Sequence, residues 1–167
     1  MITGTSGTTT DTLPALINSN VSRALLYGVD FSFEYNFYNN FVVYGTGSYV
    51  RGKDTESDTN LPLIPPLKGR MGIRYTYPGI GSAEFITNAA ARQDKISAGE
   101  QETDGFVRLD MALSSEKIML GNNTGLQIFA GIDNITDTNY TNHLSTNRGS
   151  ISIEPGRNIY IRLNLSF

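Results

Sequence analysis

The C-terminal stretch of the chain, residues 133–167, reads DNITDTNYTNHLSTNRGSISIEPGRNIYIRLNLSF. From residue 158 onward, apolar and polar side chains alternate without interruption. The apolar set is Ile159, Ile161, Leu163, Leu165 and Phe167, and the polar set is Asn158, Tyr160, Arg162, Asn164 and Ser166. Because successive side chains of a strand point to opposite faces, this alternation predicts a strand with one apolar and one polar face. Such a strand fits a soluble sandwich, where its apolar face meets a second sheet, or an outer-membrane barrel, where that face meets lipid.

Further segments upstream of this strand repeat the rhythm less regularly. They lie at residues 28–37, 41–51, 70–77, 83–93, 107–114 and 126–133. Together they predict an all-β, antiparallel, up-and-down sheet of about seven strands. The connections expected at residues 52–66, 94–103 and 134–155 are long and polar, whereas the turns after residues 37 and 77 are short. Long loops on one rim and short turns on the other are typical of outer-membrane barrels.

Aromatic residues gather near the short-turn ends of these segments. They are Tyr35, Phe37, Phe41, Tyr75, Tyr77 and Phe167. This placement predicts an interfacial girdle of the kind that membrane barrels carry, with aromatics that cap a sandwich core as the less favoured alternative.

Composition and charge exclude several classes of protein. The chain has 167 residues, 39% of them hydrophobic, which predicts an ordered domain. Its net charge is -3 and its 13 Lys and Arg residues form no stripe, so we expect no nucleic-acid partner. The chain has no cysteine, which excludes disulfides and thiolate chemistry. The N-terminal residues lack the basic and apolar regions of a signal peptide, so we expect a mature segment of a longer precursor.

The short motifs in the C-terminal stretch resemble the C-terminal end of TonB-dependent outer-membrane receptors. They are NITD at 134–137, Tyr140, NHLS at 142–145 and PGRN at 155–158, followed by the terminal Phe167. The resemblance extends from about Val21 to the end and includes LIPP at 63–66. A terminal alternating strand that ends in Phe is similar to the signal read by the barrel assembly machinery. The residues to which this resemblance assigns that signal are Tyr160, Leu163, Leu165 and Phe167.

About seven strands are too few to close a barrel, since about eight is the usual minimum. The resemblance implies a much larger barrel of ~22 strands, of which the chain forms a sector. We expect residues 1–20 to be a surface loop or truncated strand, and residues 21–167 to be the C-terminal part of the transmembrane barrel. The alternative is a small complete barrel, acting as a porin or structural anchor, to which residues 1–20 contribute a strand.

Charged side chains fall on the polar faces of the predicted strands, where they would face the lumen. They are Asp30, Glu34, Arg74, Arg108, Asp110, Asp133 and Arg162. Buried charges need partners. A plug domain inside the barrel would supply them, and pairing between neighbouring strands is an equally good explanation.

His143, Ser145 and Asp137 suggest a hydrolase trio, because some outer-membrane barrels hydrolyse lipids. All three belong to one polar segment that matches the receptor pattern as a whole, so we favour a packing or hydrogen-bonding role for His143. An outer-membrane lipid hydrolase remains the weakest alternative. One histidine, no cysteine and scattered carboxylates predict no metal, cofactor or catalytic site.

The resemblance implies a transporter rather than an enzyme. Members of the family take up a siderophore, cobalamin or other metal complex across the outer membrane of Gram-negative bacteria. Their partners are the membrane lipid, a plug domain and the TonB energy-coupling system, the last two through an N-terminal part that this chain lacks. The long loops are expected to select the substrate, and no residue in them can be assigned a ligand.

Overall fold

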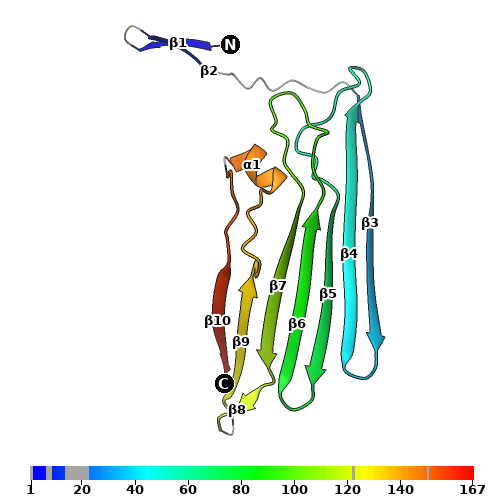
Figure 1. The fold of residues 1–167 in the computed structure, drawn as a ribbon, viewed down its shortest axis with the longest axis vertical. Helices are drawn as coiled ribbons and strands as arrows, with labels where there is room; N and C mark the ends of the chain where they lie inside the picture. Colours follow the sequence, from blue (N-terminus) through cyan, green and yellow to red (C-terminus); the bar gives the residue numbers. More distant parts are fainter. Residues whose placement is uncertain (1, 7–8, 14–22, 122, 150) are drawn as a thin grey trace.

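The computed structural model describes residues 2–6, 9–13, 23–121, 123–149 and 151–167. One antiparallel sheet dominates it, with strand order β10-β9-β7-β6-β5-β4-β3 (Figure 1). The strands of this path are β3 (Ala24–Phe37), β4 (Phe41–Asp54), β5 (Lys68–Tyr77), β6 (Gly81–Ala90), β7 (Phe106–Ser115), β9 (Gly125–Asp133) and β10 (Asn158–Ser166). Each is joined to its neighbour in up-and-down order. The prediction of an all-β sector of about seven antiparallel strands is confirmed.

The sheet is unclosed: β3 and β10 form its two edges and do not pair with each other. A separate hairpin consists of β1 (Ile2–Ser6) and β2 (Thr9–Leu13), within the segment expected to be a loop or truncated strand. Residues 1, 7–8 and 14–22 of that region, including the expected boundary at residue 21, lie outside the described residues.

The two faces of the sheet differ in chemistry as the alternation predicts. Residues paired across the ladder share a face, so the register aligns Phe33, Gly45 and Met71 on one side, and Glu34, Tyr44 and Gly72 on the other. The first is the apolar face, and its large side chains are exposed; Ile161, for example, is 74% exposed. Among the described residues Ile86 is the only buried hydrophobic, and it lies on the polar face. The sheet is therefore inverted relative to a soluble sandwich, which buries its apolar face.

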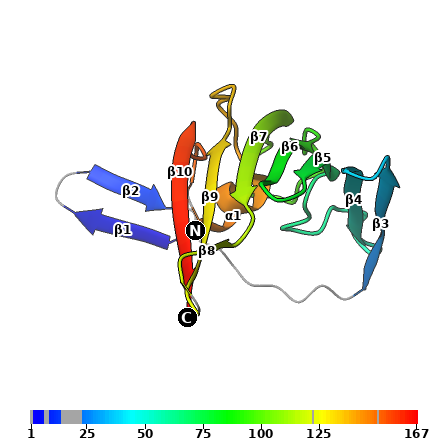
Figure 2. The same ribbon diagram turned by 90° about the horizontal axis from the view of Figure 1, so that it is seen from below.

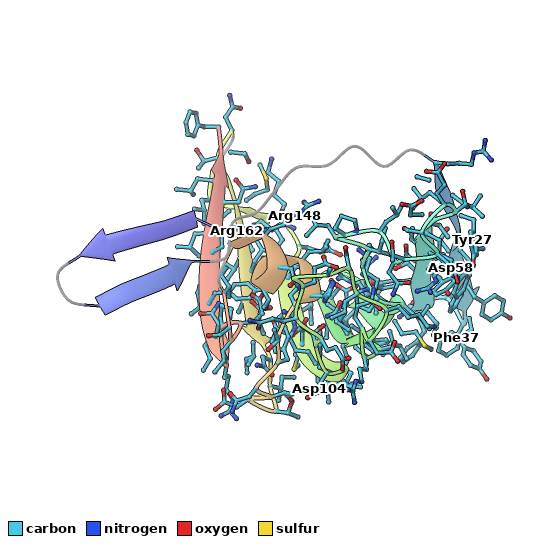
Figure 3. The ribbon with its side chains drawn as sticks, turned by 90° about the horizontal axis from the view of Figure 1, so that it is seen from above. Tyr27, Phe37, Asp58, Asp104, Arg148 and Arg162 are labelled. Carbon is cyan, nitrogen blue, oxygen red and sulfur yellow. The ribbon has the colours of Figure 1, made fainter. Side chains whose placement is uncertain are left out.

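Curvature places the polar face inside. Viewed along the strands, the sheet bends into an arc, with α1 (His143–Gly149) on its concave side (Figure 2). The labelled Tyr27 and Phe37 of β3 lie on the outer side, away from α1 (Figure 3). We call the concave side the polar face and the convex side the apolar face.

The predicted asymmetry of the connections is confirmed. Residues 38–40 and 78–80 make short turns at one end of the sheet, while the connections 55–67, 91–105 and 134–157 lie at the other. The short turns need left-handed backbone, with Tyr38 at φ 51° and Gly79 at φ 80°. The third connection at the short-turn end contains β8 (Ile118–Met119), which pairs with β9 and was not predicted.

Two further differences from the sequence-based expectation have local causes. β4 continues to Asp54, beyond the expected end at residue 51, because Lys53 and Asp54 pair with the start of β3. The helix α1 lies in a segment expected to be loop, and Asn142 caps it: its carboxamide oxygen accepts the N–H of Leu144 at 3.1 Å. The alternation of β4 is blurred at Gly45 and Gly47 because the rings of Phe33 and Phe31 occupy the space a Cβ would fill.

The aromatics at the short-turn end form a continuous row of ring contacts. Phe41 links the β3–β4 turn to β5, with its ring centroid 5.3 Å from that of Phe37 and 4.6 Å from that of Tyr75. Tyr35 and Tyr77 extend the row at either end, each 6.5 Å from its neighbour. Phe167 lies at the same end of the sheet and is fully exposed. Interfacial aromatics are one of the marks of a membrane barrel.

Candidate functional site

The centre of the polar face holds a charged network that joins β4, β5 and β6. The Arg74 guanidinium lies 3.0 Å from the Glu84 carboxylate and 5.6 Å from the centroid of the Tyr44 ring. The Tyr44 hydroxyl donates to the same Glu84 carboxylate. The ring of Tyr44 lies over Gly72, where any side chain would collide with it. Residues of the neighbouring strands therefore supply the ion-pair and ring partners of Arg74, which was predicted to face the lumen.

A second network on the polar face is built around Asp110 of β7, which is 5% exposed. Its Oδ2 accepts from Arg108 at 2.8 Å and from Asn88 of β6 at 2.7 Å, and its Oδ1 accepts the backbone N–H of Asn134 at 2.8 Å. Arg108 also donates to the Tyr140 hydroxyl at 2.9 Å. This network fixes the connection 134–157 to the sheet.

The short motifs of that connection contact one another. Asn134, in the left-handed region at φ 54°, exchanges two hydrogen bonds of 2.9 Å with the backbone of Thr138. The Asp137 carboxylate accepts the N–H of Arg157 at 2.8 Å, and the Arg157 side chain donates to the carbonyl of Ile135 at 3.0 Å. The NITD and PGRN motifs thus close the base of the loop, which explains why they occur together.

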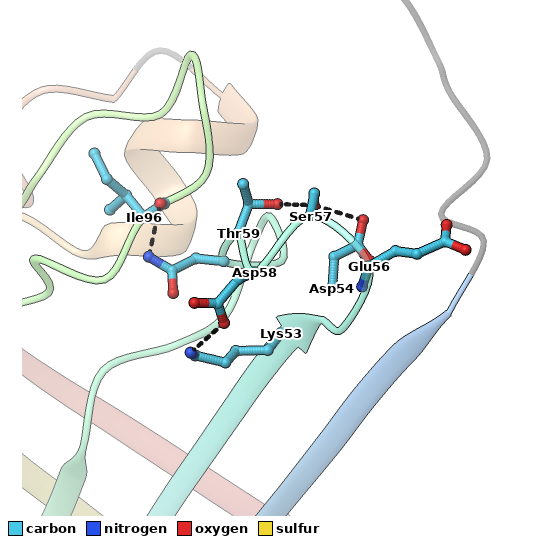
Figure 4. A network of polar contacts seen from close by, with 8 residues as sticks. Lys53, Asp54, Glu56, Ser57, Asp58, Thr59 and Ile96 are labelled. Atoms are coloured by element: carbon cyan, nitrogen blue, oxygen red, sulfur yellow. Dashed lines mark hydrogen bonds and ion pairs between the residues drawn. The ribbon is translucent and has the colours of Figure 1, made fainter.

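The three long connections are tied to one another above the polar face, and we call them together the loop cap (residues 55–67, 91–105 and 134–157). The N–H of Leu63 donates to Glu100 at 2.6 Å, and the Gln93 side chain donates to the carbonyl of Ile64 at 2.7 Å. Figure 4 shows the polar contacts of the first loop, including the bond that Ile96 accepts from Asn60 at 3.1 Å. Gln101 and Asn147 exchange two bonds that link the second loop to α1.

His143 is buried where α1 meets the second loop. Its Nδ1 lies 3.2 Å from both the Thr103 hydroxyl and the Asn147 carboxamide nitrogen. The same carboxamide nitrogen donates to the backbone carbonyls of Gln101 at 3.2 Å and of His143 at 3.0 Å, which fixes its position beside the ring. Burial lowers the pKa of His143, and the nearby Glu100 carboxylate opposes this shift only in part. Within the described part of the chain, no hydrogen bond links His143 to Ser145 or Asp137, so the trio lacks hydrolase geometry.

A cavity of ≈ 570 Å³ separates the loop cap from the polar face of the sheet. Its floor includes Asp30, Lys68, Arg70 and Asn88, and its loop-side wall includes Asp104 and His143. The remaining predicted lumen charges lie on the polar face outside this cavity. Glu34 is in register with Tyr44, Asp133 with Asn158, and the Arg162 guanidinium lies 4.5 Å from the centroid of the Phe129 ring.

Several residues of the site were not anticipated from sequence. Glu84, Asn88 and Tyr44 lie in segments with poor alternation, and Asn134 and Tyr140 were noted only as parts of motifs. No group of three or more potential metal-ligating side chains occurs in the part of the chain that the structure describes. In the same part, no helix is long and apolar enough to cross a membrane.

Comparison with known proteins identifies the fold. The family model described as "TonB dependent receptor-like, beta-barrel" matches residues 1–135. The chain belongs to this family. This confirms the resemblance noted in the C-terminal motifs, most of which lie beyond the matched residues. The TonB-dependent receptor barrel therefore accounts for the inverted sheet.

A solved structure with a similar fold is titled "Copper transporter OprC". The similarity has a TM-score of 0.74 at 26% sequence identity and covers 86% of this chain but only 24% of that chain. This chain thus spans about a quarter of the copper transporter, as a sector of a larger barrel should. No match was found among curated proteins.

Proposed function

We propose that this chain is the C-terminal barrel wall of an outer-membrane active transporter that takes up a siderophore, cobalamin or another metal complex. The observation that carries the proposal is the inverted sheet of a TonB-dependent receptor-like barrel, with exposed apolar side chains outside and paired charges inside. The neighbouring structure, titled as a copper transporter, supports transport as the activity. Nothing in this role requires bond-making, so the chain is proposed to act as a transporter and not as an enzyme.

In this proposal, residues 1–20 are a surface loop or truncated strand and residues 21–167 span the outer membrane of a Gram-negative bacterium. The apolar face contacts lipid. Tyr160, Leu163 and Leu165 on β10, with Phe167 directly after it, form the signal for the barrel assembly machinery. The two unpaired edges, β3 and β10, favour a sector over a small complete barrel, because a closed barrel leaves no edge unpaired.

The charged networks of the polar face are proposed to line the lumen against a plug domain. Arg74, Arg108 and Asp110 each have an ion-pair partner within the sheet, whereas Asp30, Glu34, Asp133 and Arg162 have no ion pair among the described residues. The second group are the proposed contacts of the plug. TonB would act through the plug rather than through this chain.

Transport is tested in cells that carry the full-length receptor. Uptake of radiolabelled ferric siderophores, cobalamin and copper is compared between wild-type cells, cells without the receptor and cells without TonB. We expect uptake of one of these substrates to need both the receptor and TonB. Uptake that persists without TonB would favour a passive pore instead.

A further inference from the structure

Two neighbouring cations of β5, Lys68 and Arg70, differ from the other cations in the middle of the polar face. Arg74 and Arg108 each lie within 3.0 Å of a carboxylate. Lys68 and Arg70 have no ion pair in the part of the chain that the structure describes. Both are exposed and both line the cavity beneath the loop cap. Because they are two residues apart on one strand, their side chains leave the sheet on the same face.

The groups beside these cations are neutral hydrogen-bonding side chains. The register pairs Lys68 with Ser48, and Arg70 with Thr46 on one side and Asn88 on the other. All three of these neighbours also line the cavity. The Asn88 carboxamide already donates to Asp110, so the floor of the cavity offers two positive charges and two hydroxyls, a set that suits an oxyanion.

The acidic groups of the cavity do not neutralise this pair. Asp30 is in register with Ser48, which puts two strand spacings, ~10 Å, between its strand and that of Lys68. Asp104 interacts electrostatically with Arg92, which is itself ion-paired with Glu102 at 2.6 Å. Arg70 also interacts with the Tyr44 hydroxyl, which donates to Glu84; this contact is with an uncharged group, and Glu84 is ion-paired with Arg74, so Arg70 has no carboxylate of its own.

We propose that Lys68 and Arg70 form a subsite for a carboxylate or phosphate group of the transported ligand, so that the receptor selects an anionic complex. This inference rests on the proposed function. The cavity volume of ≈ 570 Å³ falls in the range of small-molecule sites. Its loop-side wall includes Pro65, Pro66, Asn142 and Leu144, which places the subsite where a ligand arrives from the loop side of the sheet.

The test is calorimetric binding to the purified full-length receptor, with ferric citrate and inorganic phosphate as anionic probes. Neutral cyanocobalamin and free Cu²⁺ serve as comparison probes. We expect an anionic probe to bind more tightly than either, with an affinity that falls as salt rises. Preference for ferric citrate identifies a carboxylate subsite, and preference for phosphate a phosphate subsite. Tighter binding of cyanocobalamin or Cu²⁺ overturns the inference.

The double variant Lys68→Gln, Arg70→Gln should bind the preferred anion at least about tenfold more weakly, since two charge-assisted contacts are lost. The control Lys117→Gln removes an exposed cation at the short-turn end, outside the cavity, and should change the affinity by less than about twofold. The charge-retaining variant Lys68→Arg, Arg70→Lys should keep most of the affinity, which separates loss of charge from misfolding. Unchanged binding by the Gln variant overturns the inference.

Two results separate this inference from its alternatives. If the Gln variant loses thermal stability without ligand as strongly as it loses binding, the pair contacts the plug domain and the inference is wrong. If the wild-type receptor binds the anion but uptake does not depend on TonB, the proposed transport function fails while the subsite stands.

Discussion

Asp110 shows how one buried carboxylate holds strands and a loop together. It accepts hydrogen bonds from Asn88, from Arg108 and from the backbone of Asn134. Its side chain is 8% exposed, and that of its partner Arg108 is 29% exposed. Removing the carboxylate leaves a cation and two further donors without their acceptor, which is more costly than the net value of the pair itself.

We predict that Asp110→Ala destabilises the receptor by on the order of 3 kcal/mol. The measurement is urea unfolding of the full-length protein in lipid vesicles. Asp58→Asn, which removes the charge of the solvent-exposed pair with Lys53 and tolerates the left-handed backbone at φ 52°, is the control and should leave the unfolding midpoint unchanged. Equal effects from the two substitutions would contradict the role assigned to Asp110.

His143 makes the docking of α1 dependent on pH. Its pKa is lowered from 6.5 by burial, so the docked loop binds fewer protons than the undocked loop at mildly acidic pH. Stability therefore rises with pH, is fully present above pH ~6.5 and declines as pH falls below that value.

We predict faster hydrogen exchange at residues 143–149 and 101–103 at pH 5.5 than at pH 7.5, after correction for the intrinsic rates. Amides of β6 should keep their protection. In the His143→Phe variant, the exchange rates of these loop-cap amides should no longer differ between pH 5.5 and pH 7.5. A pH-dependent difference of the same size in that variant would show that another group is responsible.

At the scale of elements, β10 shows the two environments of one strand most clearly. Leu163 is 62% exposed on the apolar face, while the adjacent Asn164 lies on the polar face opposite Gln127. We predict that Leu163→Arg destabilises the folded receptor in lipid vesicles by about 2 to 4 kcal/mol, as Arg does near the bilayer midplane. Asn164→Arg should be tolerated much better. Equal tolerance at the two positions would show that the apolar face does not contact lipid.

The end of β10 provides a separate prediction about assembly. Phe167 is fully exposed and follows the last residue of the strand. Deletion of Phe167 from the full-length protein should lower the amount assembled in the outer membrane, measured as heat-modifiable protein in membrane fractions. Phe167→Tyr keeps the aromatic ring and should assemble more efficiently than the deletion. Normal assembly of the deletion would remove Phe167 from the signal.

At the scale of the whole molecule, the sheet has edges that need partners. Seven strands at ~4.8 Å spacing make a ribbon ~30 Å wide, well short of the circumference of a plug-bearing barrel. We predict that the 167-residue piece, expressed alone in detergent, forms β-rich oligomers or aggregates and does not bind the ligand tightly. Light scattering checks its size. A monodisperse monomer whose β3 and β10 amides are both protected from exchange would instead support a small complete barrel.

The sequence by itself determined the features that depend on neighbours along the chain. Alternation with period two assigned Leu163 and Asn164 to opposite faces, and turn residues such as Pro78 and Gly79 located the short reversals. The lengths of the polar stretches predicted which end of the sheet carries the loops. These properties are local, because the direction of a side chain follows from its position in the strand.

The tertiary structure alone decided which polar residues meet. Tyr44 and Glu84 are forty residues apart, and Thr103 and His143 are separated by the same distance in sequence. Their contacts depend on strand register and on the curvature that folds the loops over the polar face. The pattern marked Arg74, Arg108 and Asp110 as facing inward without showing that their ion-pair partners lie in the sheet. Hydrogen bonding depends on the distance between two groups in space, and the alternation pattern of the sequence predicts the face of a residue but not this distance.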